Sequence, residues 1–183
     1  MKLSEVKSLK SGADIKECTF PVAGIEFLKF EDKDGVTIAV AKDCVYDSEF
    51  GKNNNFAESD ILKNLKNELL PKLEAEVGAE NIKEFELDLT SHDGLDTYGK
   101  IKTRIGIPTF DFYRENVRLF DKYKIDDWWW LATPDTTKEH YNGSWITCVS
   151  PRGDINYYNY CHYINGVRPF LHFVSSISVS CEG

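Results

Sequence analysis

His92, Asp93 and Asp96 are the residues whose types and spacing come closest to acid–base chemistry in this chain. A histidine beside carboxylates can transfer protons, and all three lie within the segment SHDGLDTYGK. The same residue types also build turns, because aspartate side chains hydrogen-bond to backbone amides a residue or two further on. Since no nucleophile accompanies them, the segment is better interpreted as a turn.

The five cysteines do not form a recognisable reactive motif. Their number is odd, and they lack the CxxC spacing that is typical of zinc and redox sites. A metal site built from Cys161, His162, His172 and Cys181 would lack that spacing too, so we expect no metal and no cofactor. The N-terminus lacks the apolar run of a secretory signal, which predicts reduced thiols and a location in the cytoplasm of the producing cell or in a virion.

Recognition is the chemistry that residues 127–173 favour. This stretch holds all four tryptophans and five of the nine tyrosines. Tyrosine offers a large contact area at a low cost in conformational entropy and asparagine adaptable hydrogen bonds, although tyrosine is also common in strands for packing reasons. We expect a ligand-binding surface that comprises Trp129, Tyr141, Trp145, Tyr157, Tyr158, Asn159, Tyr160, His162 and Tyr163.

The charge of the chain narrows the class of partner. Its formal net charge is −8 at pH 7, whereas nucleic-acid binding needs clustered Lys and Arg to replace counterions. No run approaches the roughly 20 apolar residues that span a bilayer. We therefore expect neither a nucleic-acid nor a membrane partner, but a protein or glycan ligand, with oligomerisation left open.

The elements that must position this surface begin with a β-hairpin. Two apolar runs, residues 21–30 and 36–41, flank the sequence EDKDG, whose Asp34-Gly35 pair suits a tight turn. The DKDG also resembles the start of an EF-hand loop, but the acidic residue at the far end of such a loop is missing. We expect residues 1–55 to form a β-rich subregion packed on a main domain, residues 56–183.

Two helices are expected in the main domain. The first begins near Ser59, whose hydroxyl can cap the first turn, and its leucines recur at helical spacing up to Gly78. Pro71 interrupts it, and a proline inside a helix costs roughly 3 kcal/mol, so a kink or a new start is expected there. The second helix follows Thr109 as its cap and runs to about Tyr123.

Strand periodicity dominates the rest of the main domain. Alternation of side chains along the strand at residues 127–131 places Trp128 and Trp130 on one side, as structural residues, and Trp129 on the other. Residues 132–143 are expected to form a long loop. Further strands are expected at residues 83–90, 144–149, 155–164 and 166–174.

Arg168 lies within the last of these strands. A buried guanidinium must be paired and hydrogen-bonded, because an unpaired charge is costly to remove from water. We therefore expect Arg168 to have a structural role and to anchor loop carbonyls or a carboxylate such as Asp127 or Asp135.

On the motifs quoted next, residues 45–175 resemble an uncharacterised family from gut bacteria, their prophages and phages. WWWLATP at residues 128–134 and NGVRPFL at residues 165–171 are similar to the WWLRSP-like and GVRPAL-like elements of that family. Ala132-Thr133 stands where the family often has Arg-Ser, so no role for that arginine carries over.

The same closing elements resemble C-type-lectin-like folds, of the branch that contains formylglycine-generating enzymes and retroelement variable proteins. This resemblance implies an α+β fold whose short antiparallel strands are braced by two helices and whose one face presents side chains for binding. The paired cysteine segment of the enzymes is absent, so a non-enzymatic phage or prophage binding protein is expected.

Two more specific roles remain open. Residues 156–165, NYYNYCHYIN, contain residue types that arise from asparagine codons when adenines are mutated, as in retroelement-diversified sites, and receptor binding is the other role. The alternative from a different class is an intracellular phage effector that inhibits a host defence protein through an acidic surface.

Overall fold

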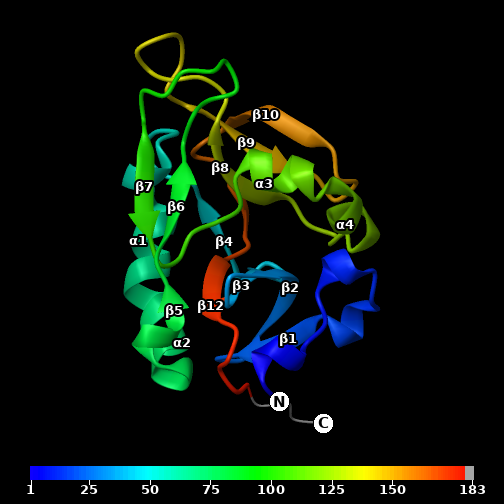
Figure 1. Cartoon of the computed structure of the whole chain (residues 1–183). Helices are drawn as coiled ribbons and strands as arrows, with labels where there is room; N and C mark the ends of the chain where they lie inside the picture. Colours follow the sequence, from blue (N-terminus) through cyan, green and yellow to red (C-terminus); the bar gives the residue numbers. More distant parts are fainter. Residues whose placement is uncertain (180–183) are drawn as a thin grey trace.

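Two five-stranded sheets that exchange strands form the frame of the computed structural model, which describes residues 1–179 (Figure 1). Across the first sheet the order is β1 (Thr19–Val22), β2 (Ile25–Lys33), β3 (Val36–Ala41), β12 (Phe170–Val174) and β5 (Ile82–Lys83). Across the second it is β10 (Ile155–Tyr160), β9 (Trp145–Val149), β8 (Trp129–Pro134), β11 (Ile164–Val167) and β4 (Tyr46–Glu49). A separate hairpin pairs β6 (Phe85–Asp88) with β7 (Lys100–Thr103). With the helices below, the chain is of the α+β class.

The strand exchange crosses the predicted boundary at residue 55. β4 comes from the predicted N-terminal subregion but forms an edge of the second sheet, and β12 lies between β3 and β5 of the first. In Figure 1 the C-terminal strand β12, in red, returns to lie beside β3, in blue. A cut at residue 55 would therefore divide both sheets.

Tight turns determine where the N-terminal strands begin and end. Asp34 (φ 51°) and Gly35 (φ 77°) join β2 to β3, which confirms the predicted hairpin. The run of residues 21–30, predicted as one strand, is instead divided between β1 and β2 by a turn at Ala23 (φ 50°) and Gly24 (φ 74°). Alanine seldom adopts a positive φ, so the sequence pattern does not mark this turn. Short 3₁₀ helices η1 (Leu3–Glu5), η2 (Leu9–Ser11) and η3 (Ile15–Glu17) precede β1.

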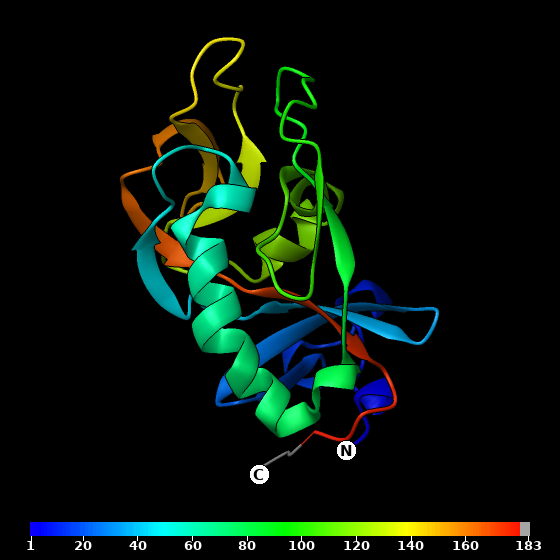
Figure 2. The same ribbon diagram turned by 90° about the vertical axis from the view of Figure 1, so that its left-hand side faces the viewer.

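The predicted first helix is present as one continuous rod with a local defect (Figure 2). The Ser59 hydroxyl accepts a hydrogen bond from the Leu62 amide at 3.0 Å, and Gly78 (φ 87°) ends the rod, both as predicted. Directly before Pro71 the backbone forms a π turn, in which the Leu70 amide donates to the carbonyl of Leu65. The rod comprises α1 (Asp60–Asn64), the π turn η5 (Leu65–Leu69) and α2 (Leu70–Val77), with 3₁₀ helices η4 (Phe56–Glu58) before it and η6 (Ala79–Asn81) after it.

The predicted second helix is two short helices, α3 (Phe110–Glu115) and α4 (Val117–Lys122). Thr109 caps the first of them by accepting a hydrogen bond from the Phe112 amide at 3.2 Å, as predicted. Asn116 (φ −115°, ψ 15°) leaves helical geometry and separates the two. Its side-chain amide donates to the Phe112 carbonyl at 2.8 Å, a bond that competes with continuation of the helix.

The predicted final strand, residues 166–174, is divided between the two sheets at Arg168-Pro169. Arg168 is 1 % exposed and donates to the carbonyls of Ala41, at 3.0 Å, and Lys42, at 2.9 Å. Its guanidinium lies 4.7 Å from the ring centroid of Trp129. The anchoring of loop carbonyls is thus confirmed, and neither predicted carboxylate takes part in these bonds. Burial lowers the pKa of Arg168 to about 10, which still leaves it charged at neutral pH.

The tryptophan strand and the final arginine segment are neighbours in the second sheet. Gly166 of β11 pairs with Trp129 of β8 in parallel register, and a side chain at Gly166 would collide with the Cys44 sulfur. Strand β8 runs three residues beyond the predicted end at residue 131, and all six of its residues are buried. No helix within residues 1–179 combines the length and apolarity that crossing a membrane requires.

Candidate ligand-binding site

A cavity of about 790 Å³ lies among loops at the end of the second sheet. Figure 2 shows the two longest loops, residues 89–99 in green and residues 135–144 in yellow, rising side by side beyond the sheets. We call this space the loop cavity. Its lining residues are His92, Asp93, Phe110, Asp135, Thr136, His140, Tyr141, Trp145 and Tyr157.

Aromatic rings supply much of the lining of the loop cavity. Trp145, at the start of β9, lies 5.7 Å from the ring centroid of Tyr141. His92 packs edge-on against Phe110, at 4.5 Å, and against Tyr157 of β10, at 5.0 Å. Such edge-to-face pairs fix ring orientation, so much of the aromatic lining is held in place before any ligand arrives.

A hydrogen-bonded Asp93–His140 pair joins the two long loops at the loop cavity. The Asp93 carboxylate accepts hydrogen bonds from His140 Nδ1 at 2.7 Å and from the Thr136 hydroxyl at 2.6 Å. Burial alone would raise the pKa of Asp93, but these bonds and one from Ser91 lower it to about 2, so the group is ionised at neutral pH. The turn predicted here exists, because the Gly94 amide donates to the Ser91 carbonyl, yet Asp93 also binds across to the second loop.

Asp135 and His92 are the other titratable groups of the loop cavity. Burial, followed by the charge of Asp93, raises the pKa of the half-buried Asp135. No residue in the described part of the chain donates a hydrogen bond to the Asp135 carboxylate. Burial also lowers the pKa of His92, whose Nε2 lies 2.8 Å from the Thr147 hydroxyl, so this ring is neutral at pH 7.

Asn54 holds these loops together and was not singled out in the sequence. It is fully buried, and its amide nitrogen donates to the carbonyls of Thr136 at 2.8 Å and Trp145 at 2.7 Å. A third, longer bond of 3.3 Å reaches the carbonyl of Asn142. Its oxygen accepts from the Tyr98 hydroxyl at 2.7 Å. A single asparagine thus ties the chain before α1 to both long loops.

Four of the predicted tyrosines present exposed rings. Tyr141 is 73 % exposed, Tyr157 39 %, Tyr160 38 % and Tyr163 48 %. Contacts between rings extend from Trp145 to Tyr160 (6.3 Å) and from Tyr160 to Tyr163 (5.6 Å). Exposed His162 lies beside Tyr160 at 5.2 Å. We call the continuous set Tyr141, Trp145, Tyr160, His162 and Tyr163 the aromatic strip; one end of it enters the loop cavity.

Two predicted ligand residues are in the wrong place for that role. Trp129 is 2 % exposed and packs against Tyr113 and Phe120 beneath the sheet. Asn159 is 7 % exposed, and its amide donates to the Cys148 sulfur at 3.0 Å. Both are core residues, and the prediction is wrong for them. The side chain of Tyr158 lies outside the described part of the structure.

The two outer tryptophans also differ from each other. Trp130 is fully buried and donates from its indole to the Ser48 carbonyl at 2.8 Å, which confirms its structural role. Trp128 lies just before β8 and is 41 % exposed, so the predicted packing of both tryptophans on one inner side is wrong. Only the backbone carbonyl of Trp128 has a clear structural role, as acceptor for the Gly166 amide at 2.7 Å.

The described cysteines are unsuited to nucleophilic chemistry. Cys18, Cys44, Cys148 and Cys161 are free thiols, and Cys181 lies outside the described residues. Burial raises the pKa of Cys44 to about 12 and that of Cys148 to about 11, so both are protonated at neutral pH. Within residues 1–179, no three His, Cys, Asp or Glu side chains gather where they could hold a metal ion.

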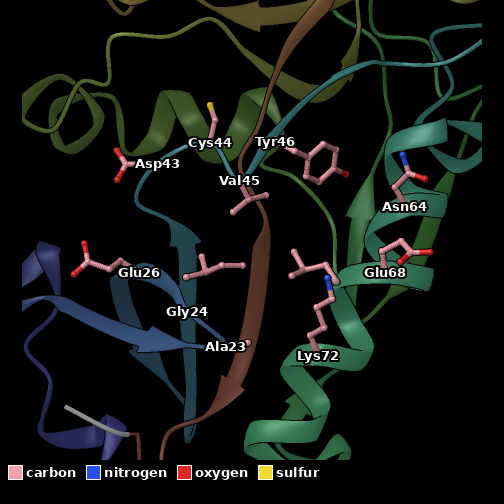
Figure 3. A pocket seen from close by; sticks show the side chains of 12 residues that line it. Ala23, Gly24, Glu26, Asp43, Cys44, Val45, Tyr46, Asn64, Glu68 and Lys72 are labelled. Carbon is pink, nitrogen blue, oxygen red and sulfur yellow. The ribbon is translucent and has the colours of Figure 1, made fainter. Parts of the chain in front are cut away.

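A second cavity, of about 760 Å³, lies between the first sheet and the first helix (Figure 3). We call it the helix cavity. Tyr46 points from β4 toward the helix, whose Glu68 and Lys72 line the far side. The Tyr46 hydroxyl is buried and has no hydrogen-bond partner among the described residues, and burial raises its pKa to about 12. None of the predicted ligand residues lines this cavity.

Comparison with known proteins supplies no relative, because no family model, no curated protein and no solved structure matches this chain. The function must therefore be argued from the geometry of the loop cavity and the aromatic strip.

Proposed function

We propose that this chain is a non-enzymatic binding protein that holds a protein or glycan ligand on the aromatic strip and in the loop cavity. The C-type-lectin-like fold and the phage or prophage origin that the sequence resemblance implies belong to the same proposal. A virion component or a receptor-binding protein of such an origin needs a surface of this kind.

The observation that supports the proposal best is the continuity between exposed rings and a cavity. Exposed apolar patches on soluble proteins mark interaction sites, and tyrosine and tryptophan are enriched in the parts of interfaces that contribute most to affinity. Here the exposed Tyr141 contacts Trp145, which lines the cavity and contacts Tyr160. A ligand can therefore lie along the strip while one of its groups enters the cavity.

The polar groups of the loop cavity support binding rather than simple packing. Ligand sites typically combine apolar walls with a few fixed polar groups that set orientation. In the loop cavity the Asp93–His140 pair and the Asp135 carboxylate have this arrangement. Hydrogen bonds hold the Asp93–His140 pair, and Asn54 fixes the backbone of the loop that carries Asp135, so this arrangement does not depend on a ligand.

The test begins with the wild-type protein on a glycan array and a displayed random-peptide library. Each ligand found is then titrated against a double variant, Tyr141→Ala with Tyr160→Ala, which removes two exposed rings and no core contact. Loss of at least tenfold in affinity is expected, which is about 1.4 kcal/mol.

The matched control is Trp128→Ala, which removes a ring that is 41 % exposed and lies at the opposite end of β8. It should bind every ligand as the wild type does. The proposal is overturned if no ligand is found in either collection, or if the double variant binds each ligand as tightly as the control.

A further inference from the structure

We infer that the loop cavity takes an alkylammonium group, which lies against its aromatic rings and pairs with the Asp135 carboxylate. This inference rests on the proposed function, because it names the chemical class of the group that enters the cavity. Three observations carry it: the charge of the lining, the bonding state of the carboxylates and the rings.

The charged groups of the loop cavity favour a cation. Its lining contains Asp93, Asp135 and His140 but no lysine or arginine. His140 is bonded to Asp93, which leaves the charge of Asp135 without a counterion in the cavity. The nearby Arg114 is paired with Asp111 at 3.1 Å. An anionic ligand would meet repulsion here, whereas a cation would meet an uncompensated carboxylate.

The carboxylates of Asp93 and Asp135 differ in how many hydrogen bonds they receive from the protein. Asp93 already accepts three hydrogen bonds, from Ser91, Thr136 and His140. Asp135 is half-buried and receives no hydrogen bond from any described residue, so its carboxylate remains open to a donor from a ligand. An N–H donor or a cationic methyl group beside Asp135 would supply what the protein itself does not.

Besides a carboxylate, the loop cavity has aromatic rings, which also bind cations. The faces of tryptophan, tyrosine and phenylalanine carry negative potential and attract cations within about 6 Å of the ring centre, which is how quaternary ammonium groups are recognised. Phe110, Tyr141, Trp145 and Tyr157 all line the cavity. Phe110 already has the Arg114 guanidinium at 5.8 Å from its ring, so this lining accepts cations in its own structure. A neutral sugar could stack on the same rings but would leave the Asp135 charge uncompensated.

The experiment uses choline and its neutral carbon isostere, 3,3-dimethylbutan-1-ol, as probes for binding to the whole protein. The two have the same shape and differ in charge, so titration followed by NMR chemical shifts isolates the cationic contribution. We expect choline to bind in the millimolar range and the isostere at least tenfold more weakly. Equal binding of the two, or no binding of choline, overturns the inference.

Asp135→Asn is the variant that tests the partner, and Glu139→Gln is its control. Glu139 is an exposed carboxylate on the same loop, so the control changes net charge equally without touching the cavity lining. Asp135→Asn should weaken choline binding at least tenfold without lowering the unfolding temperature, whereas Glu139→Gln should change it less than twofold. Equal affinity in the two variants overturns the role of Asp135.

The two proposals fail in distinguishable ways. If array or library ligands lose affinity in the double tyrosine variant while choline and its isostere bind alike, the recognition surface stands and the cation specificity is wrong. If choline binding depends on Asp135 but no ligand depends on the aromatic strip, the cavity site stands and the wider binding surface is wrong.

Discussion

Two cavities of similar size, about 790 and 760 Å³, differ in how their polar groups are held. In the loop cavity Asp93 and His140 are bonded to each other, and Asn54 fixes the loops that carry them. In the helix cavity the buried Tyr46 hydroxyl has no partner among the described residues, and Glu68 and Lys72 are exposed side chains on a helix.

The comparison teaches that volume does not identify a binding site. A site needs polar groups whose positions are fixed by the protein, because groups that must be ordered on binding cost conformational entropy. The loop cavity meets this condition through bonds that span up to 91 residues of sequence. The helix cavity is a gap between a sheet and a helix, and its lysine and glutamate are exposed side chains on that helix.

Among the proposed substitutions, removal of the Asn54 side chain should most strongly disturb the fixed arrangement that distinguishes the loop cavity from the helix cavity. Asn54→Ala leaves two short and one longer carbonyl bond unmade and deprives the Tyr98 hydroxyl of its acceptor. At about 1 kcal/mol for each buried hydrogen bond, we expect a loss of about 3 kcal/mol in the free energy of unfolding. Denaturant unfolding of the variant measures it, and ligand binding at the loop cavity should fall with it.

The neighbouring Asn53 offers a matched control for Asn54. Its amide donates to Glu58 at 2.8 Å in an exposed bond and its oxygen accepts from the Asn55 amide at 2.9 Å, so Asn53→Ala should cost about 1 kcal/mol, well below the loss expected for Asn54→Ala. Equal losses in the two variants would contradict the view that Asn54 organises the loops, and would assign the effect to the turn that contains both residues.

Acid should loosen the loop cavity before it affects the helix cavity. The pKa of Asp93 is lowered to about 2 in the folded protein, against an ordinary value of 3.8. A lowered carboxyl pKa stabilises the fold above the ordinary value, and this stabilisation is lost as the pH falls from about 4 to 2. Because the Asp93 side chain is 26 % exposed, solvent reduces the effect to about 1 kcal/mol.

The measurement compares unfolding free energies at pH 5 and pH 2 in the wild type and in Asp93→Asn. The variant lacks the titrating group, so its loss of stability over this interval should be smaller by about 1 kcal/mol. Identical losses would show that the Asp93–His140 pair does not contribute to stability, and that the two loops are held by other bonds.

Local signals explain what could be predicted of the fold. The Asp34-Gly35 turn and the caps at Ser59 and Thr109 depend on residues a few positions apart, and all three were predicted. The division of residues 166–174 between two sheets was not, because strand propensity does not say which sheet a strand joins. Only the burial of Arg168 against Ala41, 127 residues away, explains the crossing there.

In the candidate site, too, local features could be predicted from the sequence and contacts between distant residues could not. Exposed tyrosines could be predicted from composition, since their rings suit recognition wherever the loops place them. The Asp93–His140 pair could not, because its members lie 47 residues apart and the segment of Asp93 accounts for itself as a turn. Asn54 stands in the run GKNNN, where nothing distinguishes it from the asparagines on either side until its four partners are known.

The smallest expected effect, that of Tyr46→Phe, is measured against Tyr98→Phe, so that one hydroxyl is removed in each cavity. Tyr98→Phe removes a hydroxyl that donates to Asn54 and accepts from the Lys138 amide, so it should destabilise the fold by about 1–2 kcal/mol. Tyr46→Phe removes a buried hydroxyl without a described partner, so it should be neutral or stabilise the fold by up to about 1 kcal/mol.

Unfolding curves of Tyr98→Phe and Tyr46→Phe can be compared directly, because each variant loses one tyrosine hydroxyl. If Tyr46→Phe destabilises the protein as much as Tyr98→Phe, the Tyr46 hydroxyl has a favourable partner, and the helix cavity holds a fixed polar group after all. The contrast between a pre-arranged site and a packing gap would then be lost, and both cavities would have to be treated as binding sites.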